Sequence, residues 1–178
     1  MELLEQLLVI RCQTGDEDAF AELVARYEPR LRYYLRKVGD RPDDVEDRLQ
    51  DIWFDVVRGV GRLADPRAFP AWLYRIARAR TALARRQARP PALPLTDADV
   101  GDETNGDEFT DEDAARVHAA LNDLAPEHRE VLVLRFLEGM SYDDIAQVVA
   151  ESLGTVKSRI HYAKRALRDV LERSNVHE

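Results

Sequence analysis

The stretch EGMSYDDIAQVVAESLGTVKSRIHYAKRAL, residues 138–167, decides how the C-terminal part of the chain is expected to fold. Ser141 and Asp144 have the spacing of a capping box, in which each side chain accepts a hydrogen bond from the backbone at the start of a helix. The apolar residues that follow are spaced to face inward on one short helix: Ile145, Val148 and Val149. A turn at Ala150 and Glu151 comes next, so the pattern predicts a helix-turn-helix.

The second helix of this motif carries the segment's Lys and Arg residues, on a chain whose net charge is −8. Ser152 can cap it, and its core positions are Val156, Ile160, Ala163 and Leu167. Such a helix suits the major groove of DNA, because hydroxyls and Lys reach base edges while Arg and Lys meet phosphates. The candidate DNA-binding residues are Thr155, Lys157, Ser158, Arg159, His161, Tyr162, Lys164 and Arg165. The alternative is a solvated basic face on an ordinary helical bundle.

Composition excludes several other classes of site. Cys12 is the only cysteine among 178 residues, and the scattered histidines form no metal-ligand motif, so neither a disulfide nor a metal or other cofactor is expected. We expect Cys12 to be a small buried or half-buried residue in a helix. The first residues, MELLEQLLVIRCQ, lack both a basic leader and a long apolar run. They predict no signal peptide and no membrane span, and we expect a cytoplasmic protein.

Apolar residues recur at helical spacing almost throughout, which predicts an all-α chain. In the N-terminal half, helices are expected from Thr14 or Asp16 to Val38, from near Pro42 onward, and after Pro70. A loop rich in Gly and Pro is expected between the second and third of these helices, over residues 58–70.

Residues 91–113 differ from the rest of the chain, because they are rich in Pro, Gly and acids and contain no Lys or Arg. That composition is typical of a flexible acidic linker. We therefore expect two small helical domains, at residues 1–90 and 114–178.

Two helix faces in the first domain are charged. The second helix has a polar, acidic face suited to docking a basic protein surface, formed by Asp44, Asp47, Gln50 and Asp51. On the third helix, the residues spaced to pack inward are Trp72, Ile76, Ala79 and Leu83. Its basic face, beside the aromatic residues Trp72 and Tyr74, is Arg75, Arg78, Arg85 and Arg89. Such a stripe suits a DNA backbone next to unstacked bases, although we expect Trp72 itself to belong to the core.

These motifs together resemble a known family. LAPEHREVLVLRFLEGMSYDDIA and GTVKSRIHYAKRAL are similar to region 4 of the extracytoplasmic function (ECF) group of bacterial sigma-70 type sigma factors. GDEDAFAELVARYEPRLRYYLRKV, DDVEDRLQDIWF and DPRAFPAWLYRIAR look like region 2 of the same family, in the family's order. The resemblance covers nearly the whole chain outside the linker.

The resemblance implies a sigma factor that binds core RNA polymerase, through its beta and beta-prime subunits, and directs transcription initiation at promoters. Region 2 would bind polymerase through the acidic face and the minus-10 element through the basic face. A flipped base would enter a pocket beside the loop at residues 63–69. Region 4 would bind the minus-35 element, and an anti-sigma factor would be a further partner. No catalysis is implied, so the protein is not expected to be an enzyme.

The sequence departs from the family pattern at four positions. Ala79 and Leu83 stand where the family commonly has Asn and Asp, which removes an amide able to hydrogen-bond a base edge. Ala150 stands at the turn where Gly or another turn former is frequent, and Glu151 where an apolar residue is usual. If Ala150 takes a positive φ, it costs about 1 kcal/mol relative to Gly.

Two other functions compete with this interpretation. A stand-alone regulator of the LuxR-like type would use the same helix-turn-helix, but it would carry an α/β receiver or a ligand-sensing domain, and strand patterns are lacking. A nucleic-acid-processing enzyme would need more than paired carboxylates, and no nucleophile or phosphate-binding loop accompanies them. Copurification with core RNA polymerase separates a sigma factor from a stand-alone regulator.

Overall fold

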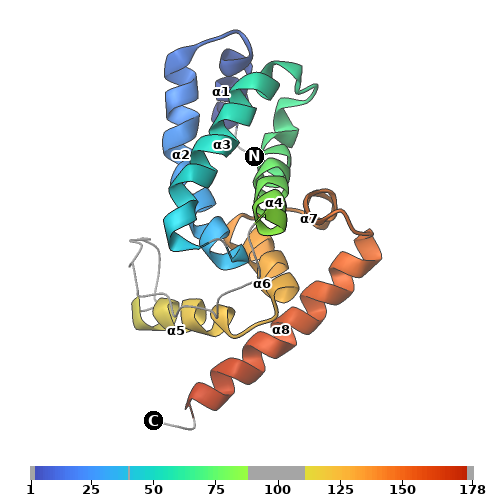
Figure 1. Cartoon of the computed structure of the whole chain (residues 1–178). Coiled ribbons are helices and arrows are strands. Elements are labelled where there is room, and N and C mark those ends of the chain that lie inside the picture. The colour runs from blue at the N-terminus through green and yellow to red at the C-terminus, as the bar shows by residue number, and fades with distance from the viewer. Residues whose placement is uncertain (1–2, 40, 88–110, 176–178) are drawn as a thin grey trace.

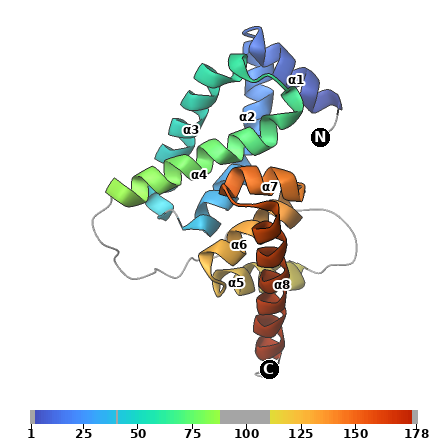
Figure 2. The same ribbon diagram turned by 90° about the vertical axis from the view of Figure 1, so that its right-hand side faces the viewer.

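The computed structural model describes residues 3–39, 41–87 and 111–175, and every regular secondary-structure element within these ranges is a helix. The predicted all-α fold class is confirmed. The helices gather into two groups that lie against each other, and the C-terminal end of the last helix, α8 (Leu153–Asn175), projects beyond the second group (Figure 1 and Figure 2). Within the described residues, no helix combines the length and the apolar character needed to cross a membrane.

The first group contains the four helices α1 (Leu3–Gln13), α2 (Glu17–Val38), α3 (Val45–Gly59) and α4 (Phe69–Gln87). Asp16 caps α2 by accepting a hydrogen bond from the backbone nitrogen of Ala19 at 3.0 Å. Gly39 ends α2 with a φ of 98°, a left-handed conformation that glycine adopts at little cost. Cys12 is buried near the end of α1, as the sequence predicts.

The core of this group is built around α2, which turns a large side chain inward at each turn. Its fully buried residues include Leu23, Tyr27, Leu31, Tyr34 and Leu35. The rings of Tyr27 and Phe69 meet edge to face at 5.4 Å, and those of Tyr34 and Tyr74 at 5.0 Å. Burial of one such side chain stabilises a fold by about 1.5–3 kcal/mol, so α2 is the central support for the other three helices.

The segment predicted as a loop over residues 58–70 is more ordered than expected. Helix α3 continues to Gly59, and short 3-10 turns follow at Val60–Arg62 and Pro66–Ala68 before α4 begins at Phe69. A β-carbon at Gly59 would lie 2.7 Å from the ring of Trp72, so glycine permits the close approach of α3 and α4. The glycine that suggested a loop is therefore a packing residue inside a helix.

The second group contains α5 (Asp111–Asn122), α6 (Pro126–Leu132), the π-helix η4 (Val133–Leu137), α7 (Tyr142–Val149) and α8. Because α5 begins at Asp111, the last three residues assigned to the linker 91–113 are helical. The remainder of the linker lies outside the described residues.

The two groups share one core. Five consecutive residues, 130–134, are all buried, which an amphipathic surface helix does not show. The reason is that α6 contacts α8 on one side and α2 of the first group on the other. Helix α7 similarly contacts α4. The buried apolar side chains of both groups form one continuous cluster, from Leu8 to Val170.

Candidate nucleic-acid and protein interfaces

The helix-turn-helix forms as the sequence predicts. The Oγ atom of Ser141 accepts a hydrogen bond from the backbone nitrogen of Asp144 at 3.1 Å, and Oδ2 of Asp144 accepts one from the backbone nitrogen of Ser141 at 3.3 Å. Ala150 ends α7 with a φ of 56°, and it is the one non-glycine residue with positive φ in the described part of the chain. The backbone nitrogen of Glu151 then donates to the carbonyl of Ala146 at 3.1 Å, which directs the chain toward α8.

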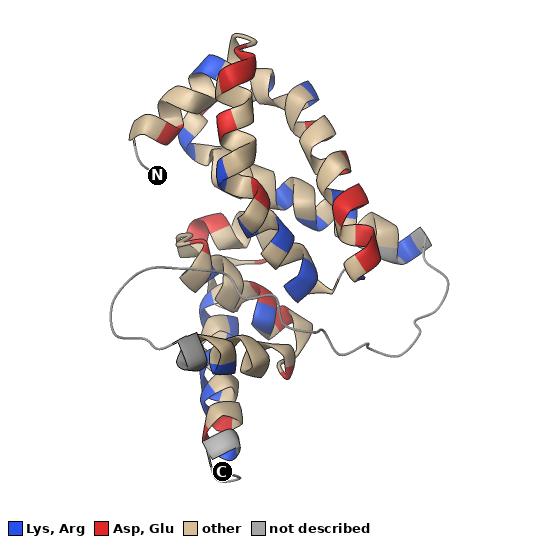
Figure 3. Cartoon of the chain, turned by 90° about the vertical axis from the view of Figure 1, so that its left-hand side faces the viewer, with Lys and Arg blue, Asp and Glu red and all other residues tan. Residues whose placement is uncertain are grey.

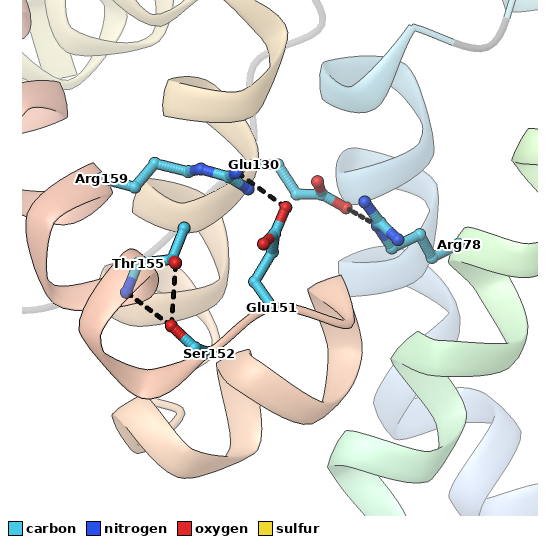
Figure 4. Close-up of polar contacts among 6 residues, drawn as sticks. All are labelled: Arg78, Glu130, Glu151, Ser152, Thr155 and Arg159. Atoms are coloured by element: carbon cyan, nitrogen blue, oxygen red, sulfur yellow. Dashed lines mark hydrogen bonds and ion pairs between the residues drawn. The ribbon is translucent and has the colours of Figure 1, made fainter.

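Helix α8 presents a polar face to solvent. Ser152 caps it, because its Oγ atom accepts from the backbone nitrogen of Thr155 at 3.1 Å (Figure 4). The predicted inward positions Val156, Ile160 and Ala163 are buried, and Leu167 is partly buried. Thr155 is half-buried. The exposed residues on the opposite face are Lys157, Ser158, His161, Tyr162, Lys164 and Arg165.

Aromatic side chains lie among the cations of this face. The ring of Tyr162 meets that of His161 edge to face at 5.5 Å, and the Nζ atom of Lys164 lies 4.9 Å from the ring centre of Phe136 on η4. Phe136 was not predicted as a surface residue, because the helical spacing of its segment gives no sign of the π-helix that turns it outward.

Arg159 differs from the other predicted DNA-binding residues. Its Nη2 atom donates to Oε1 of Glu151 at 3.1 Å, and its side chain is 18% exposed (Figure 4). Glu151, which replaces the apolar residue usual in the family, therefore partly neutralises Arg159. The structure does not display Arg159 to solvent as it does Lys157 or Arg165.

The inward face predicted for α4 is partly wrong. Trp72 and Ile76 are partly buried and pack on the core, as expected, whereas Ala79 and Leu83 are exposed. The buried positions of α4 after Phe69 are instead Ala71, Leu73, Tyr74, Ala77 and Thr81. This face is buried because α4 contacts both α3 and α7. Tyr74 is fully buried, so it is not a surface on which a base could stack in this conformation.

The structure separates the arginines predicted to line one face of α4. Arg75 is exposed. The Nε atom of Arg78 donates to Oε1 of Glu130 on α6 at 2.9 Å, so this arginine is engaged by the other domain (Figure 4). Arg85 lies in the last turns of α4, and Arg89 lies outside the described residues.

The loop predicted to flank a base pocket, residues 63–69, is held at its start by Gln13 of α1. The Nε2 atom of Gln13 donates to the backbone carbonyls of Val60 at 3.2 Å and Leu63 at 2.7 Å. Within the loop, Oδ1 of Asp65 accepts from the backbone nitrogen of Arg67 at 2.9 Å. Sequence reasoning missed Gln13, because nothing local indicates a contact with residues about fifty positions away.

The predicted polar face is exposed at all four positions: Asp47, Gln50 and Asp51 lie on α3, and Asp44 lies immediately before it, at the end of the 3-10 turn Pro42–Asp44. Figure 3 shows acidic residues gathered over the first turns of this helix. Further along α3, Asp55 forms an ion pair with Arg80 of α4. The Nε atom of Arg80 lies 2.6 Å from the Oδ2 atom of Asp55. This pair lowers the pKa of the Asp55 carboxyl below its usual value.

Two apolar side chains extend the exposed face of α3. Phe54 and Val57 are 55% and 58% exposed, and the guanidinium of Arg58 lies 4.1 Å from the ring centre of Phe54. Both residues fall outside the buried stripe of α3, formed by Val45, Leu49, Ile52, Trp53 and Val56. Their position off the stripe is a signal that could have been read from the sequence.

A buried carboxylate joins the two domains near α7. The Nη2 atom of Arg30 on α2 lies 2.8 Å from Oε2 of Glu138, whose side chain is only 3% exposed. Burial raises the pKa of Glu138 above its ordinary value of 4.5, and the Tyr74 hydroxyl and the Arg30 guanidinium offset this only in part. Burial also raises the pKa of Tyr74 well above its usual range, with a contribution from the carboxylate.

A helix-turn-helix with an exposed cationic helix, packed on a helical domain that bears one acidic and one basic helix, defines a two-domain DNA-binding protein of the all-α class. Comparison with known proteins agrees with this class. The family model for Sigma-70 region 2 matches residues 23–90, and the model for Sigma-70 region 4 matches residues 114–167.

Individual relatives cover almost the whole chain. The RNA polymerase sigma-H factor of Pseudomonas aeruginosa is 34% identical, over 94% of this chain and 94% of its own length. The ECF RNA polymerase sigma-E factor of Haemophilus influenzae is 30% identical, over 96% and 97%. Among solved structures, CnrH in complex with the cytosolic domain of CnrY has a TM-score of 0.68 and 28% identity, over 95% of this chain and 97% of that chain.

The chain belongs to the ECF group of the sigma-70 family, the sigma factors of bacterial RNA polymerase. Its function is that of a sigma factor, which directs transcription initiation by the polymerase.

Proposed function

We propose that three helices of this sigma factor bind three different partners: α3 binds core RNA polymerase, α4 contacts the minus-10 element and α8 contacts the minus-35 element. The single observation that carries the proposal is the exposed polar face of α8, presented by a complete helix-turn-helix in a chain that also contains region 2. The domain division at residues 1–90, 91–113 and 114–178 belongs to the same proposal.

Helix α8 has the chemistry of a major-groove helix. Ser158 and Lys157 lie near its start, where a recognition helix meets base edges, and Lys164 and Arg165 lie further along, where phosphates are within reach. The Tyr162 and His161 rings add apolar surface that can contact a thymine methyl group. Arg159 has a smaller share in this contact, because Glu151 already pairs with it.

Helix α3 suits a protein partner. Asp44, Asp47, Gln50 and Asp51 are all exposed, so they can meet a basic surface, and Phe54 and Val57 continue the same helix with apolar surface. Charge complementarity steers association, whereas buried apolar and aromatic side chains supply much of the binding energy. This combination fits docking on core polymerase.

Helix α4 offers Arg75 to DNA directly, whereas Arg78 must first leave Glu130. The proposal therefore includes a separation of the two domains before α4 can bind the minus-10 element with both arginines. The Gln13-held loop, residues 63–69, lies at the start of α4 and provides a fixed edge for an unstacked base.

The proposal also covers partners and location. Among solved structures similar to this chain, CnrH is bound to the cytosolic domain of CnrY, and RpoE from Bartonella quintana, at 23% identity, is bound to the anti-sigma factor NepR. Both similar chains bind a protein partner, and the complex of RpoE with NepR supports an anti-sigma factor as a further partner of this chain. A sigma factor works on polymerase and DNA without a catalytic step of its own, and its site of action is the cytoplasm.

Copurification tests the proposal. The tagged chain is mixed with core RNA polymerase, and the mixture is passed over a size-exclusion column with and without promoter DNA. We expect a stoichiometric complex that Asp47→Lys weakens and that moderate salt does not abolish. A chain that binds a specific duplex but never coelutes with core polymerase would instead be a stand-alone regulator.

A further inference from the structure

Glu130 is a buried carboxylate at the junction of the two domains. Its Oε1 atom accepts hydrogen bonds from the Tyr34 hydroxyl on α2 at 2.8 Å and from Arg78 Nε on α4 at 2.9 Å. The Glu130 side chain is 11% exposed, and Tyr34 is fully buried. Both donors belong to the N-terminal domain, whereas Glu130 belongs to the C-terminal domain. Figure 4 shows Glu130 and Arg78 reaching toward each other from facing helices.

The two donors form a set that recognises an anionic oxygen. A guanidinium and a hydroxyl that converge on one oxygen bind a carboxylate and a phosphate by the same charge-assisted hydrogen bonds. Side-chain donors of these types supply many of the contacts that proteins make to DNA phosphates. The Glu130 carboxylate therefore occupies a position on the N-terminal domain where the two donors could also bind a phosphate oxygen of DNA.

This position has an exposed arginine of α4 as a neighbour. Arg75 lies three residues before Arg78 on the same helix, and it is exposed. Residues three apart on a helix are neighbours on its surface, so Arg75 extends the positive charge beyond the subsite. A phosphate held by Arg78 and Tyr34 would thus lie in a strand that also passes Arg75.

The contacts beside Glu130 are of a kind that water can replace. The Nζ atom of Lys37 donates to Oδ1 of Asn122 at 2.7 Å, and Nη1 of Arg129 donates to the carbonyl of Lys37 at 2.9 Å. Polar contacts between domains cost little to exchange for water. The main cost of separating the domains is therefore exposure of the apolar cluster that they share, which docking on core polymerase would have to offset.

We propose that Arg78 and Tyr34 form a phosphate-binding subsite for the promoter strand at the minus-10 element, and that Glu130 occupies it as a substitute anion while the domains are together. The inference rests on the proposed function of α4 in binding the minus-10 element. Separation of the domains removes the carboxylate, and the phosphate then takes its place on the same two donors. A free sigma factor consequently binds single strands weakly, because its own C-terminal domain competes for the site.

The test uses the full chain and a fluorescein-labelled single-stranded oligonucleotide of mixed sequence, with binding followed by anisotropy at low salt. Glu130→Gln keeps the size of the side chain and one acceptor oxygen but removes its charge. We expect it to raise affinity by about two- to fivefold, the range given by a partly exposed ion pair. Glu127→Gln, at an exposed position on the same helix, is the matched control and should leave affinity unchanged.

Second substitutions identify the donors. In the Glu130→Gln background, Arg78→Ala and Tyr34→Phe should each remove the gain in affinity. A gain that survives both second substitutions would overturn the subsite, and so would an affinity equal to that of the Glu127→Gln control. Circular dichroism checks the fold of each variant. If Glu130→Gln does not fold, Glu130→Asp, which keeps the charge but shortens its reach, should still raise affinity, and no increase would overturn the proposal.

A transcription assay distinguishes failure of the proposed subsite from failure of the minus-10 contact on which it rests. Arg78→Ala is added to holoenzyme, and promoter opening is measured with permanganate on a promoter fragment. Unchanged opening would remove Arg78 from the proposed minus-10 contact. Promoter opening could instead be reduced by Arg78→Ala while Glu130→Gln has no effect on the free chain. That result would retain the minus-10 contact of Arg78 but reject the proposal that Glu130 occupies the phosphate position.

Discussion

Replacing Ala150 by glycine should stabilise the protein, although the change removes a side chain. Ala150 ends α7 with a φ of 56° and a ψ of 45°, in the left-handed region where a β-carbon crowds the following carbonyl oxygen. The residue is exposed, so its methyl group contributes little packing. The turn that positions α8 therefore includes a residue under backbone strain.

The expected gain follows from two opposing effects. Left-handed backbone costs a non-glycine residue about 1–2 kcal/mol, and glycine avoids this cost. Glycine also makes the unfolded chain more flexible, which lowers the free energy of unfolding by about 0.4–1 kcal/mol. The net gain is about 0.5–1 kcal/mol, equivalent to a rise in melting temperature of about 1–4 °C for a chain of this length.

Urea unfolding and thermal scans of the wild type and Ala150→Gly measure this gain. Ala119→Gly is the matched control, because Ala119 is exposed in the interior of α5 and the same substitution there should cost about 1 kcal/mol. Opposite signs at the two positions are expected. A loss of stability in Ala150→Gly comparable to that in Ala119→Gly would refute the assignment of strain to the turn.

Three further predictions concern charge. Asp47→Lys combined with Asp51→Lys should lower the affinity for core RNA polymerase by about tenfold or more at moderate salt, measured by titration of the labelled chain. Lys157→Ala should weaken binding to a minus-35 duplex nearly equally for all sequences, with a salt slope smaller by about one. Glu138→Gln should become more stable relative to wild type, in urea unfolding, as pH rises from 4.5 through the raised pKa. The sign follows because folded Glu138 holds its proton more tightly than unfolded Glu138, so deprotonation destabilises the fold.

Each of these predictions has its own control and its own contrary outcome. Glu22→Lys with Glu127→Lys reverses two exposed charges outside α3, and equal losses of polymerase affinity in the two double variants would remove α3 from the interface. Arg41→Ala, at an exposed position in region 2, controls for net charge, and an equal effect of Lys157→Ala would make α8 a solvated basic face. A constant difference in stability between Glu138→Gln and wild type from pH 4.5 to 8 would contradict the raised pKa.

The helix-turn-helix was predictable because its signals are local. The capping box joins Ser141 to a residue three positions away, and the inward positions of α7 and α8 follow from helical spacing alone. The caps of α2 at Asp16 and Gly39 belong to the same class of signal. Local hydrogen bonds and helical periodicity thus accounted for the fold class and most helix positions.

Helix α4 is the case in which helical periodicity alone did not determine which residues face the core. Arginines and apolar residues alternate along it, so more than one inward face was compatible with the sequence. The face that is buried, which includes Tyr74 and Ala77, was selected by contacts with α3 and α7. The exposure of Ala79 and Leu83 follows from those long-range contacts.

The charged contacts between the domains gave no sequence signal. No local pattern marks Glu130 or Glu138 as half of an ion pair, and their partners Arg78 and Arg30 are 52 and 108 residues away. Glu130 lies on α6, which packs against α2, and Glu138 lies just before α7, which packs against α4. Pairings of this kind depend on the relative position of two domains, which spacing within one helix does not encode.

Run-off transcription tests the central claim most directly. Core RNA polymerase is incubated with fragments of the source genome, with and without the chain, and the transcripts are sequenced. We expect discrete transcripts that require both core enzyme and the chain, start a short distance downstream of shared sequence elements, and decrease with Asp47→Lys and Lys157→Ala. Absence of any such transcript, from a chain that is folded and binds duplex DNA by itself, would contradict its function as a sigma factor.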